Sequence, residues 1–204
     1  MHQEYREGLR MTIIWGRWQA YPWKNELAVR SERVTIHFNE ILSDSFEGRH
    51  DPFDMLERTI VLSGFAVRRM IEKRLVTDRL AKAKIPVRTF TRGGADEFRA
   101  PFHGDTGVYP LRGNYNLEKD SAVHVSFIEL ANEIIHASQI MVVHGEPNLS
   151  DGLLIASDWH LKNRILHLTI DAFQSFVRTV LDDRIRATSD SIDFETGKAH
   201  AKRE

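Results

Sequence analysis

Apolar residues recur at helical spacing over two long stretches in the first half of the chain. The first stretch follows Asn25, a residue type that caps helix N-termini, and covers residues 26–46. The second opens at Asp51 and Pro52, because Asp accepts free backbone N–H groups and Pro at the first helical position gives up no hydrogen bond. It must end before Pro86. A short connection between two such helices predicts an antiparallel pair.

A third helix with a well-marked start is predicted from Ser126 to His136. Ser126 and Glu129 have the spacing of a capping box, in which each side chain accepts the backbone N–H of the other residue. Apolar and small residues form one wide face of this helix. The other side carries a narrow polar stripe, made of Glu129, Asn132, Glu133, His136 and Gln139.

Three short apolar runs follow, at residues 140–143, 153–156 and 165–170. Turn-forming residues separate them, so we expect three strands in an antiparallel meander. The turn at residues 158–164 is either a recognition tip that exposes Trp159 or a plain hairpin with this ring folded onto the sheet. A last amphipathic helix is predicted over residues 172–183.

Residues 84–122 have no regular period, since five glycines and three prolines interrupt them. Apart from a short strand at residues 87–89, we expect a long irregular loop, either a functional lid or binding loop or a disordered segment. Residues 184–204 are polar and charged, which is typical of a mobile tail. The expected fold is one mainly helical α+β domain over residues 1–183. It comprises a long antiparallel helix pair, a central helix, a three-stranded antiparallel meander and a C-terminal helix.

The composition limits where the protein is expected to be located and which chemistry its side chains can carry out. The chain has 204 residues, of which 42% are hydrophobic and 28% charged, as expected for one globular domain. It has no apolar run long enough to cross a bilayer and no signal-peptide pattern, so we expect a cytoplasmic protein without a membrane partner. The absence of cysteine excludes disulfides, thiolate catalysis and Cys-based zinc sites.

The net charge of −1 hides a basic segment. Residues 68–92 contain nine Lys or Arg against two acidic residues, Glu72 and Asp78. Such a segment could contact the phosphates of a nucleic acid, and a solvated helix face is the alternative.

Asn132 and His136 lie one helical turn apart and can act on the same small group. The alternative is an ordinary amphipathic helix whose polar side faces water. The run from Ala131 to His136 resembles the Arg-x4–6-His motif, often Arg-Asn-x-x-x-His, of HEPN domains. These are small helical bundles, many of which are metal-independent ribonucleases. Ala131 stands where that motif has arginine, and the region is also similar to uncharacterised bacterial proteins.

The resemblance implies that His136 assists the attack of a 2′-hydroxyl on the adjacent phosphodiester. An arginine would then neutralise the growing charge, which Ala131 cannot do, so degenerate or absent ribonuclease activity is expected. Arg68 or Arg69 of the second helix could supply the missing cation, and Lys73 could add a phosphate contact. Alternatively these arginines face solvent, or Arg68 pairs with Glu72 at i,i+4 spacing.

The sequence gives little support for a metal site or for nucleophilic catalysis. The nearest thing to a metal-ligand motif is His103-Gly104-Asp105, and neither an HExxH nor a nucleophile-elbow motif is present. We therefore predict no metal and no cofactor. The leading hypothesis is an RNA-associated, HEPN-like protein. The alternative is a non-catalytic scaffold that binds a protein partner or a second copy of itself, through its aromatic N-terminus and residues 84–122.

Overall fold

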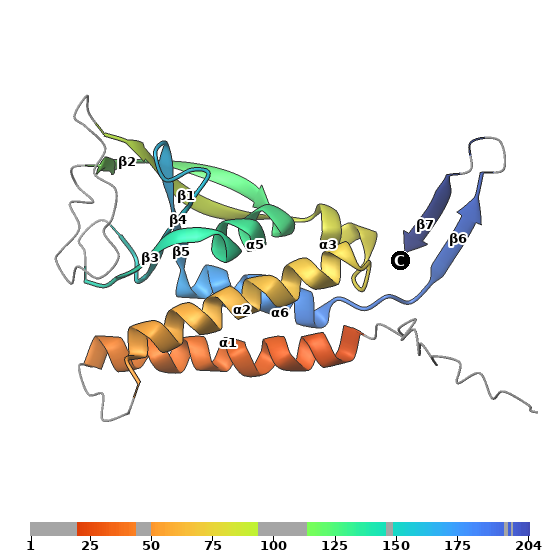
Figure 1. Ribbon diagram of the computed structural model, residues 1–204, viewed down its shortest axis with the longest axis horizontal. Helices are drawn as coiled ribbons and strands as arrows, with labels where there is room; N and C mark the ends of the chain where they lie inside the picture. The colour runs from red at the N-terminus through yellow and green to blue at the C-terminus, as the bar shows by residue number, and fades with distance from the viewer. Residues whose placement is uncertain (1–19, 44–49, 94–113, 146–148, 194–195, 197) are drawn as a thin grey trace, which may run out of the picture.

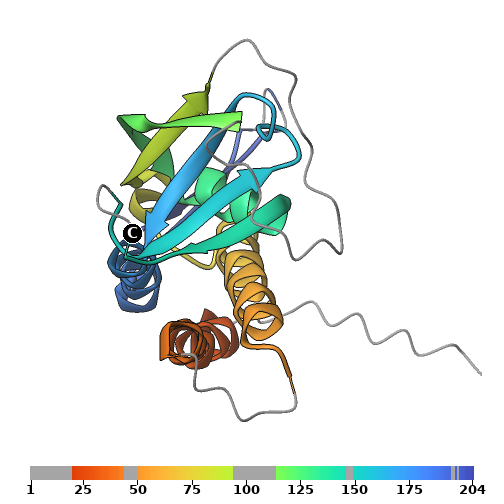
Figure 2. The same cartoon turned by 90° about the vertical axis from the view of Figure 1, so that its left-hand side faces the viewer.

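Five antiparallel strands form a sheet, and helices cover one of its faces (Figure 1, Figure 2). The computed structural model describes residues 20–43, 50–93, 114–145, 149–193, 196 and 198–204. In chain order the elements are α1 Ala20–Ser43, α2 Pro52–Glu72, α3 Asp78–Lys82, β1 Lys84–Arg92, β2 Tyr115–Ser126, α5 Phe127–Ile135, β3 Ala137–Val143, β4 Gly152–Ser157, β5 Arg164–Thr169, α6 Ile170–Asp182, β6 Thr188–Ile192 and β7 Ala199–Arg203.

The strands lie in the order β2-β1-β5-β4-β3, and every neighbouring pair is antiparallel. β3, β4 and β5 form a meander, and β5 joins it to the β1–β2 pair. Because β2 and β3 lie at opposite edges, the connection through α5 crosses the sheet. The end of α5 thereby meets the turn between β4 and β5, where the backbone N–H of Asp158 donates to the carbonyl of His136 at 3.0 Å.

The prediction of a mainly helical domain with a three-stranded meander is wrong, because the sheet has five strands. β1 contains the short strand predicted at residues 87–89 but is longer, and most of β2 lies in the part of residues 84–122 where the sequence predicts an irregular loop; residues 94–113 lie outside the described residues. Most side chains of β2 are exposed or half-buried, so this strand carries no apolar period. It is an edge strand that is held by its backbone pairing to β1, from Lys84 opposite Ser126 to Phe90 opposite Asp120.

The first helix begins at Ala20, which corrects the predicted cap at Asn25. Pro22 does not prevent this, because a proline in the first turn of a helix interrupts no hydrogen bond within it. Leu27, Val34 and Phe38, which belong to the apolar residues at helical spacing, are buried. α1 and α2 run side by side in opposite directions, as the sequence predicts (Figure 1).

The start of α2 agrees with the sequence, and α2 also packs closely against α5. The Asp51 carboxylate accepts the backbone N–H of Phe53 at 2.8 Å. Further along, a Cβ added at Gly64 would lie 2.9 Å from Ile134 Cγ2 and 3.3 Å from the Ala131 carbonyl oxygen. The missing side chain at Gly64 therefore lets the two helices approach each other closely.

The main hydrophobic core lies between the helices and one face of the sheet. Leu153, Ile155, Leu166 and Leu168 contribute from β4 and β5, and residues of α1, α2, α5 and α6 complete it. Alternate positions of the strands point to the opposite face. There a smaller cluster includes Phe90, Tyr115, Leu154, Ala156 and Ile165. Burial in this cluster raises the pKa of Tyr115 to about 12, and its hydroxyl donates to the Leu161 carbonyl.

The segment 184–204, expected to be a mobile tail, contains a two-stranded hairpin of β6 and β7. The hairpin returns to the body, because the backbone N–H of Arg203 donates to Asp78 at 3.1 Å. Backbone hydrogen bonds rather than apolar side chains hold this hairpin, so composition alone does not reveal it. No helix among the described residues is long and apolar enough to cross a membrane.

His167 of β5 is a buried histidine that should make stability depend on pH. Its side chain is 1% exposed, Nε2 donates to the Ser150 carbonyl at 2.9 Å, and Nδ1 is buried with no hydrogen-bond partner among the described residues. Burial lowers the pKa of His167 below its ordinary value, with the Ser150 hydrogen bond opposing and the Arg88 charge adding to the effect. The folded state therefore resists a proton that the unfolded state accepts.

We expect the free energy of unfolding to fall as the pH drops below about 6.5, by up to about 1.4 kcal/mol per pH unit from this one group. The expected sign follows because the unfolded chain binds more protons there. His167→Gln keeps an N–H donor and removes the titrating group, so its stability should depend less on pH. Urea unfolding of both proteins between pH 7.5 and about 5.5 measures the difference, and parallel curves would contradict the assignment.

Candidate functional site

The predicted capping box positions the helix that carries Asn132 and His136. The Ser126 hydroxyl accepts the Glu129 backbone N–H at 3.2 Å, and the Glu129 carboxylate accepts that of Ser126 at 2.7 Å. These hydrogen bonds lower the pKa of Glu129. The helix ends one residue earlier than the sequence predicts, at Ile135, and His136 caps it with φ −102° and ψ 22°. His136 therefore lies at the junction of α5 and β3.

Arg68 of α2 contacts the imidazole of His136. Its Nη1 lies 3.3 Å from His136 Nε2, and its Nε donates to the Glu72 carboxylate at 2.7 Å. The structure therefore contains both arrangements that the sequence leaves open, the arginine beside the histidine and the bridge to Glu72. Because a guanidinium group has donors only, the contact requires a lone pair on Nε2. A neutral His136 in this geometry carries its proton on Nδ1.

Trp159 covers the other part of the His136 ring. The two ring centroids are 4.4 Å apart with an angle of 39° between the planes, and Trp159 remains 58% exposed. The turn that carries Trp159 is fixed to the end of α5, because Asp158 accepts a hydrogen bond from the Ser138 hydroxyl and donates one to the His136 carbonyl. Trp159 thus stacks on the histidine and also presents an aromatic surface to solvent, so it is not folded away onto the sheet.

The other predicted site residues occupy different positions. Asn132 is half-buried, and its Oδ1 is buried with no hydrogen-bond partner among the described residues. Arg69 points away from Arg68 by about 100° around the helix axis, so it does not face His136 in the same way. Lys73 is exposed and caps the C-terminus of α2. Of the three predicted phosphate-binding cations, Arg68 is the one that the fold brings to the histidine.

A second polar cluster on the same helix was not predicted as part of the site. The Glu133 side chain is 5% exposed, and its Oε1 lies 2.6 Å from His160 Nδ1 and 2.8 Å from Arg164 Nη2. Oε2 of Glu133 and Nε of Arg164 are buried without hydrogen-bond partners among the described residues. The sequence places Glu133 on the polar stripe of this helix, and the β4–β5 turn folds over it. The i,i+4 spacing of His160 and Arg164 in that turn is the one signal that could have indicated this cluster.

The Glu133–His160 pair has the geometry of a carboxylate-oriented imidazole. A carboxylate against Nδ1 keeps the proton on that nitrogen and leaves Nε2 available for proton exchange. The Ser157 hydroxyl lies 3.3 Å from the same Nδ1 atom and is fully buried, so it is not placed as a nucleophile. His160 and Trp159 are neighbours in one turn. The surface at the end of α5 therefore combines two imidazoles, two guanidinium groups and an exposed aromatic ring.

Metal ligation has no candidate in the part of the chain that the structure describes, where no three His, Asp or Glu side chains come close enough together to hold an ion. His103 and Asp105 lie outside that part, as do residues 1–19 with most of the aromatic N-terminus. Comparisons of the chain with protein-family models, with curated proteins and with solved structures found no match.

Proposed function

We propose that this protein binds single-stranded RNA at the surface formed by Arg68, His136 and Trp159 and cleaves it without a metal ion. The proposal is carried by the 3.3 Å contact between the Arg68 guanidinium and the His136 imidazole. In the motif that this helix resembles, the arginine and the histidine belong to one segment. Here α2 supplies the guanidinium that Ala131 lacks, so the same pair of functional groups is assembled from two helices.

The exposed ring of Trp159 suits an unpaired base. Aromatic side chains stack on bases of single strands, and each stacked base contributes about 1–3 kcal/mol to binding. A base on Trp159 would bring its neighbouring phosphate to Arg68. The guanidinium could then donate to phosphate oxygens instead of His136 Nε2, which would free that nitrogen to accept a proton.

The cleavage step needs a proton acceptor, a proton donor and a cation. One imidazole takes the proton of the 2′-hydroxyl while its oxygen bonds to phosphorus, and the bond from phosphorus to the 5′-oxygen breaks. The second imidazole protonates the leaving oxygen, which gives a 2′,3′-cyclic phosphate and a free 5′-hydroxyl. His136 and His160 are the two imidazoles of the surface, and Arg68 compensates the charge that grows on the phosphate oxygens.

The test is incubation of purified protein with a fluorescent single-stranded RNA in the presence of EDTA. We expect products ending in a 2′,3′-cyclic phosphate, and we expect His136→Ala to slow cleavage by about 10²- to 10⁴-fold. Arg68→Ala should weaken both binding and cleavage. A matched substrate with 2′-deoxyribose at every position should still bind and should remain intact.

The matched control is His144→Ala. His144 is exposed and pairs with Asp151 at 3.0 Å near the other end of β3, so its loss should leave cleavage unchanged. Equal loss in His136→Ala and His144→Ala would contradict the assignment of the site. Cleavage at the wild-type rate in His136→Ala would contradict the catalytic role of His136.

A partner-binding role is the alternative function, and exposed apolar side chains on the helix pair favour it. α1 and α2 leave several large residues more than two-fifths exposed, namely Tyr21, Val29, Ile36, Phe53 and Phe65. The RNA experiment separates the two functions. A protein that neither cleaves RNA nor binds it in a salt-dependent way would leave the partner-binding role.

A further inference from the structure

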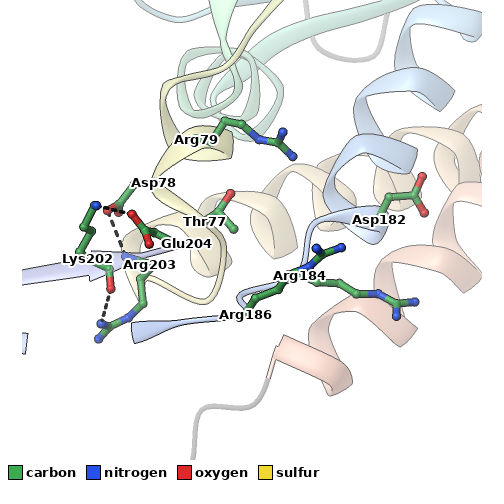
Figure 3. Close-up of a pocket in the computed structure, with 9 residues that line it drawn as sticks. All are labelled: Thr77, Asp78, Arg79, Asp182, Arg184, Arg186, Lys202, Arg203 and Glu204. Carbon is green, nitrogen blue, oxygen red and sulfur yellow. Dashed lines mark hydrogen bonds and ion pairs between the residues drawn. The ribbon is translucent and has the colours of Figure 1, made fainter. Parts of the chain in front are cut away.

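A cleft lies between α3, the end of α6 and the C-terminal hairpin, away from the residues of the RNA site (Figure 3). It has a volume of about 830 Å³, within the range of pockets that hold small molecules. Five cationic and three acidic side chains line it, together with Thr77: Arg79, Arg184, Arg186, Lys202 and Arg203 against Asp78, Asp182 and Glu204.

The acidic side chains do not neutralise all of these cations. Glu204 pairs with Lys202, and Asp78 accepts the backbone N–H of Arg203. Outside the cleft lining, Asp190 pairs with the Arg203 guanidinium at 2.7 Å.

Among the described residues, the guanidinium groups of Arg79, Arg184 and Arg186 have no hydrogen-bond or ion-pair partner, and none is drawn in Figure 3. The cleft thus holds three arginines with free donors.

A buried hydrogen-bonded pair, Thr77 and Asp183, connects the backbone segments that carry Arg79 and Arg184. The Asp183 carboxylate is buried and accepts the Thr77 backbone N–H at 2.8 Å and the Thr77 hydroxyl at 2.6 Å. Thr77 caps α3 two residues before Arg79, and Asp183 directly precedes Arg184. The hydrogen bonds between Thr77 and Asp183 therefore fix the backbone from which the side chains of Arg79 and Arg184 extend.

The third arginine is fixed by the hairpin. The backbones of Ala187 and Glu204 pair through hydrogen bonds of 3.0 and 2.9 Å, next to Arg186. All three arginines thus extend from backbone that is held in place by hydrogen bonds. The three side chains themselves are exposed, so their guanidinium donors are open to an anion that enters the cleft.

We propose that this cleft binds a compact run of phosphate groups, such as the oligophosphate of a small molecule, through Arg79, Arg184 and Arg186. Guanidinium forks match phosphate oxygens in bidentate hydrogen bonds. Three unpaired cations in one cleft suit adjacent phosphates, whereas an extended nucleic-acid strand spaces its single charges along a groove. This proposal does not depend on the RNA site.

The experiment is calorimetric titration of the full chain with tripolyphosphate at constant ionic strength near 0.15 M, roughly physiological. We expect saturable binding, and a loss of affinity of about tenfold or more in Arg184→Ala and in Arg186→Ala. Arg178→Ala is the matched control, since Arg178 is an exposed arginine on α6 that does not line the cleft.

Three results would overturn the proposal. They are no binding of tripolyphosphate, equal weakening in Arg178→Ala, or full affinity in both cleft variants. A parallel titration with a single-stranded RNA that lacks a 5′-triphosphate distinguishes the source of phosphate. If Arg184→Ala and Arg186→Ala weaken this RNA while tripolyphosphate does not bind, the cleft contacts a nucleic-acid backbone and the oligophosphate assignment is wrong.

Discussion

Replacing Ala131 with arginine should destabilise the protein by at least about 3 kcal/mol, although it restores the HEPN motif letter for letter. Ala131 is 0% exposed and packs where α5 meets α2, with its carbonyl oxygen 3.3 Å from the position of a Cβ at Gly64. A guanidinium at this position would be buried without a partner and would push the two helices apart. Urea unfolding monitored by tryptophan fluorescence measures the loss.

Asn132→Arg is the matched control for this prediction. It places the same side chain one residue further along α5, at a half-buried position from which a long side chain can reach water. Its cost should be clearly smaller. An Ala131→Arg protein as stable as the wild type would contradict the packing of α5 against α2.

Gly152→Ala should cost at least about 3 kcal/mol, the upper end for overpacking by one methyl group. Gly152 begins β4 and pairs with Thr169 of β5. A Cβ at this position would lie 2.6 Å from the Leu168 carbonyl oxygen and 2.7 Å from Thr169 Cα. Both are backbone atoms of β5, so no rotamer change can relieve the clash.

Gly64→Ala makes the same chemical change against a softer neighbour. Its closest contact is the Ile134 side chain at 2.9 Å, which can shift, and alanine favours a helix over glycine by about 1 kcal/mol. We therefore expect a much smaller loss than in Gly152→Ala. Chemical denaturation of both variants under identical conditions provides the comparison, and equal losses would contradict the predicted difference between a backbone and a side-chain neighbour.

The contact between Arg68 and His136 brings together two residues from different helices. The sequence indicates His136. It offers Arg68 or Arg69 in place of the arginine that the motif has at position 131, and it does not decide between them. The choice depends on the side of α2 that faces α5, which Gly64 sets by allowing close contact at one point of the helix. Arg68 lies one turn beyond Gly64 on the same face, at i+4, and so arrives at His136.

The helix starts that depend on residues close together in the sequence are predicted correctly. The capping box of Ser126 and Glu129 and the Asp51 cap both involve residues within three positions of one another. Their geometry follows from local backbone conformation, so the sequence alone is sufficient. The helical spacing of apolar residues in α2 and the apolar runs of β4 and β5 are also local signals. They arise because an element that is buried on one or both faces has a repeating pattern of apolar residues.

The sequence by itself determined the local helix signals and three of the strands, because each is encoded within a few residues. Only the tertiary structure decided that β2 pairs with β1 at the edge of a five-stranded sheet and that β6 and β7 form a hairpin, since the polar strands β2, β6 and β7 are held by backbone pairing. It likewise decided the burial of Glu133 and the contact of Arg68 with His136. Contacts across 27 to 68 positions depend on how elements pack, which no local pattern encodes.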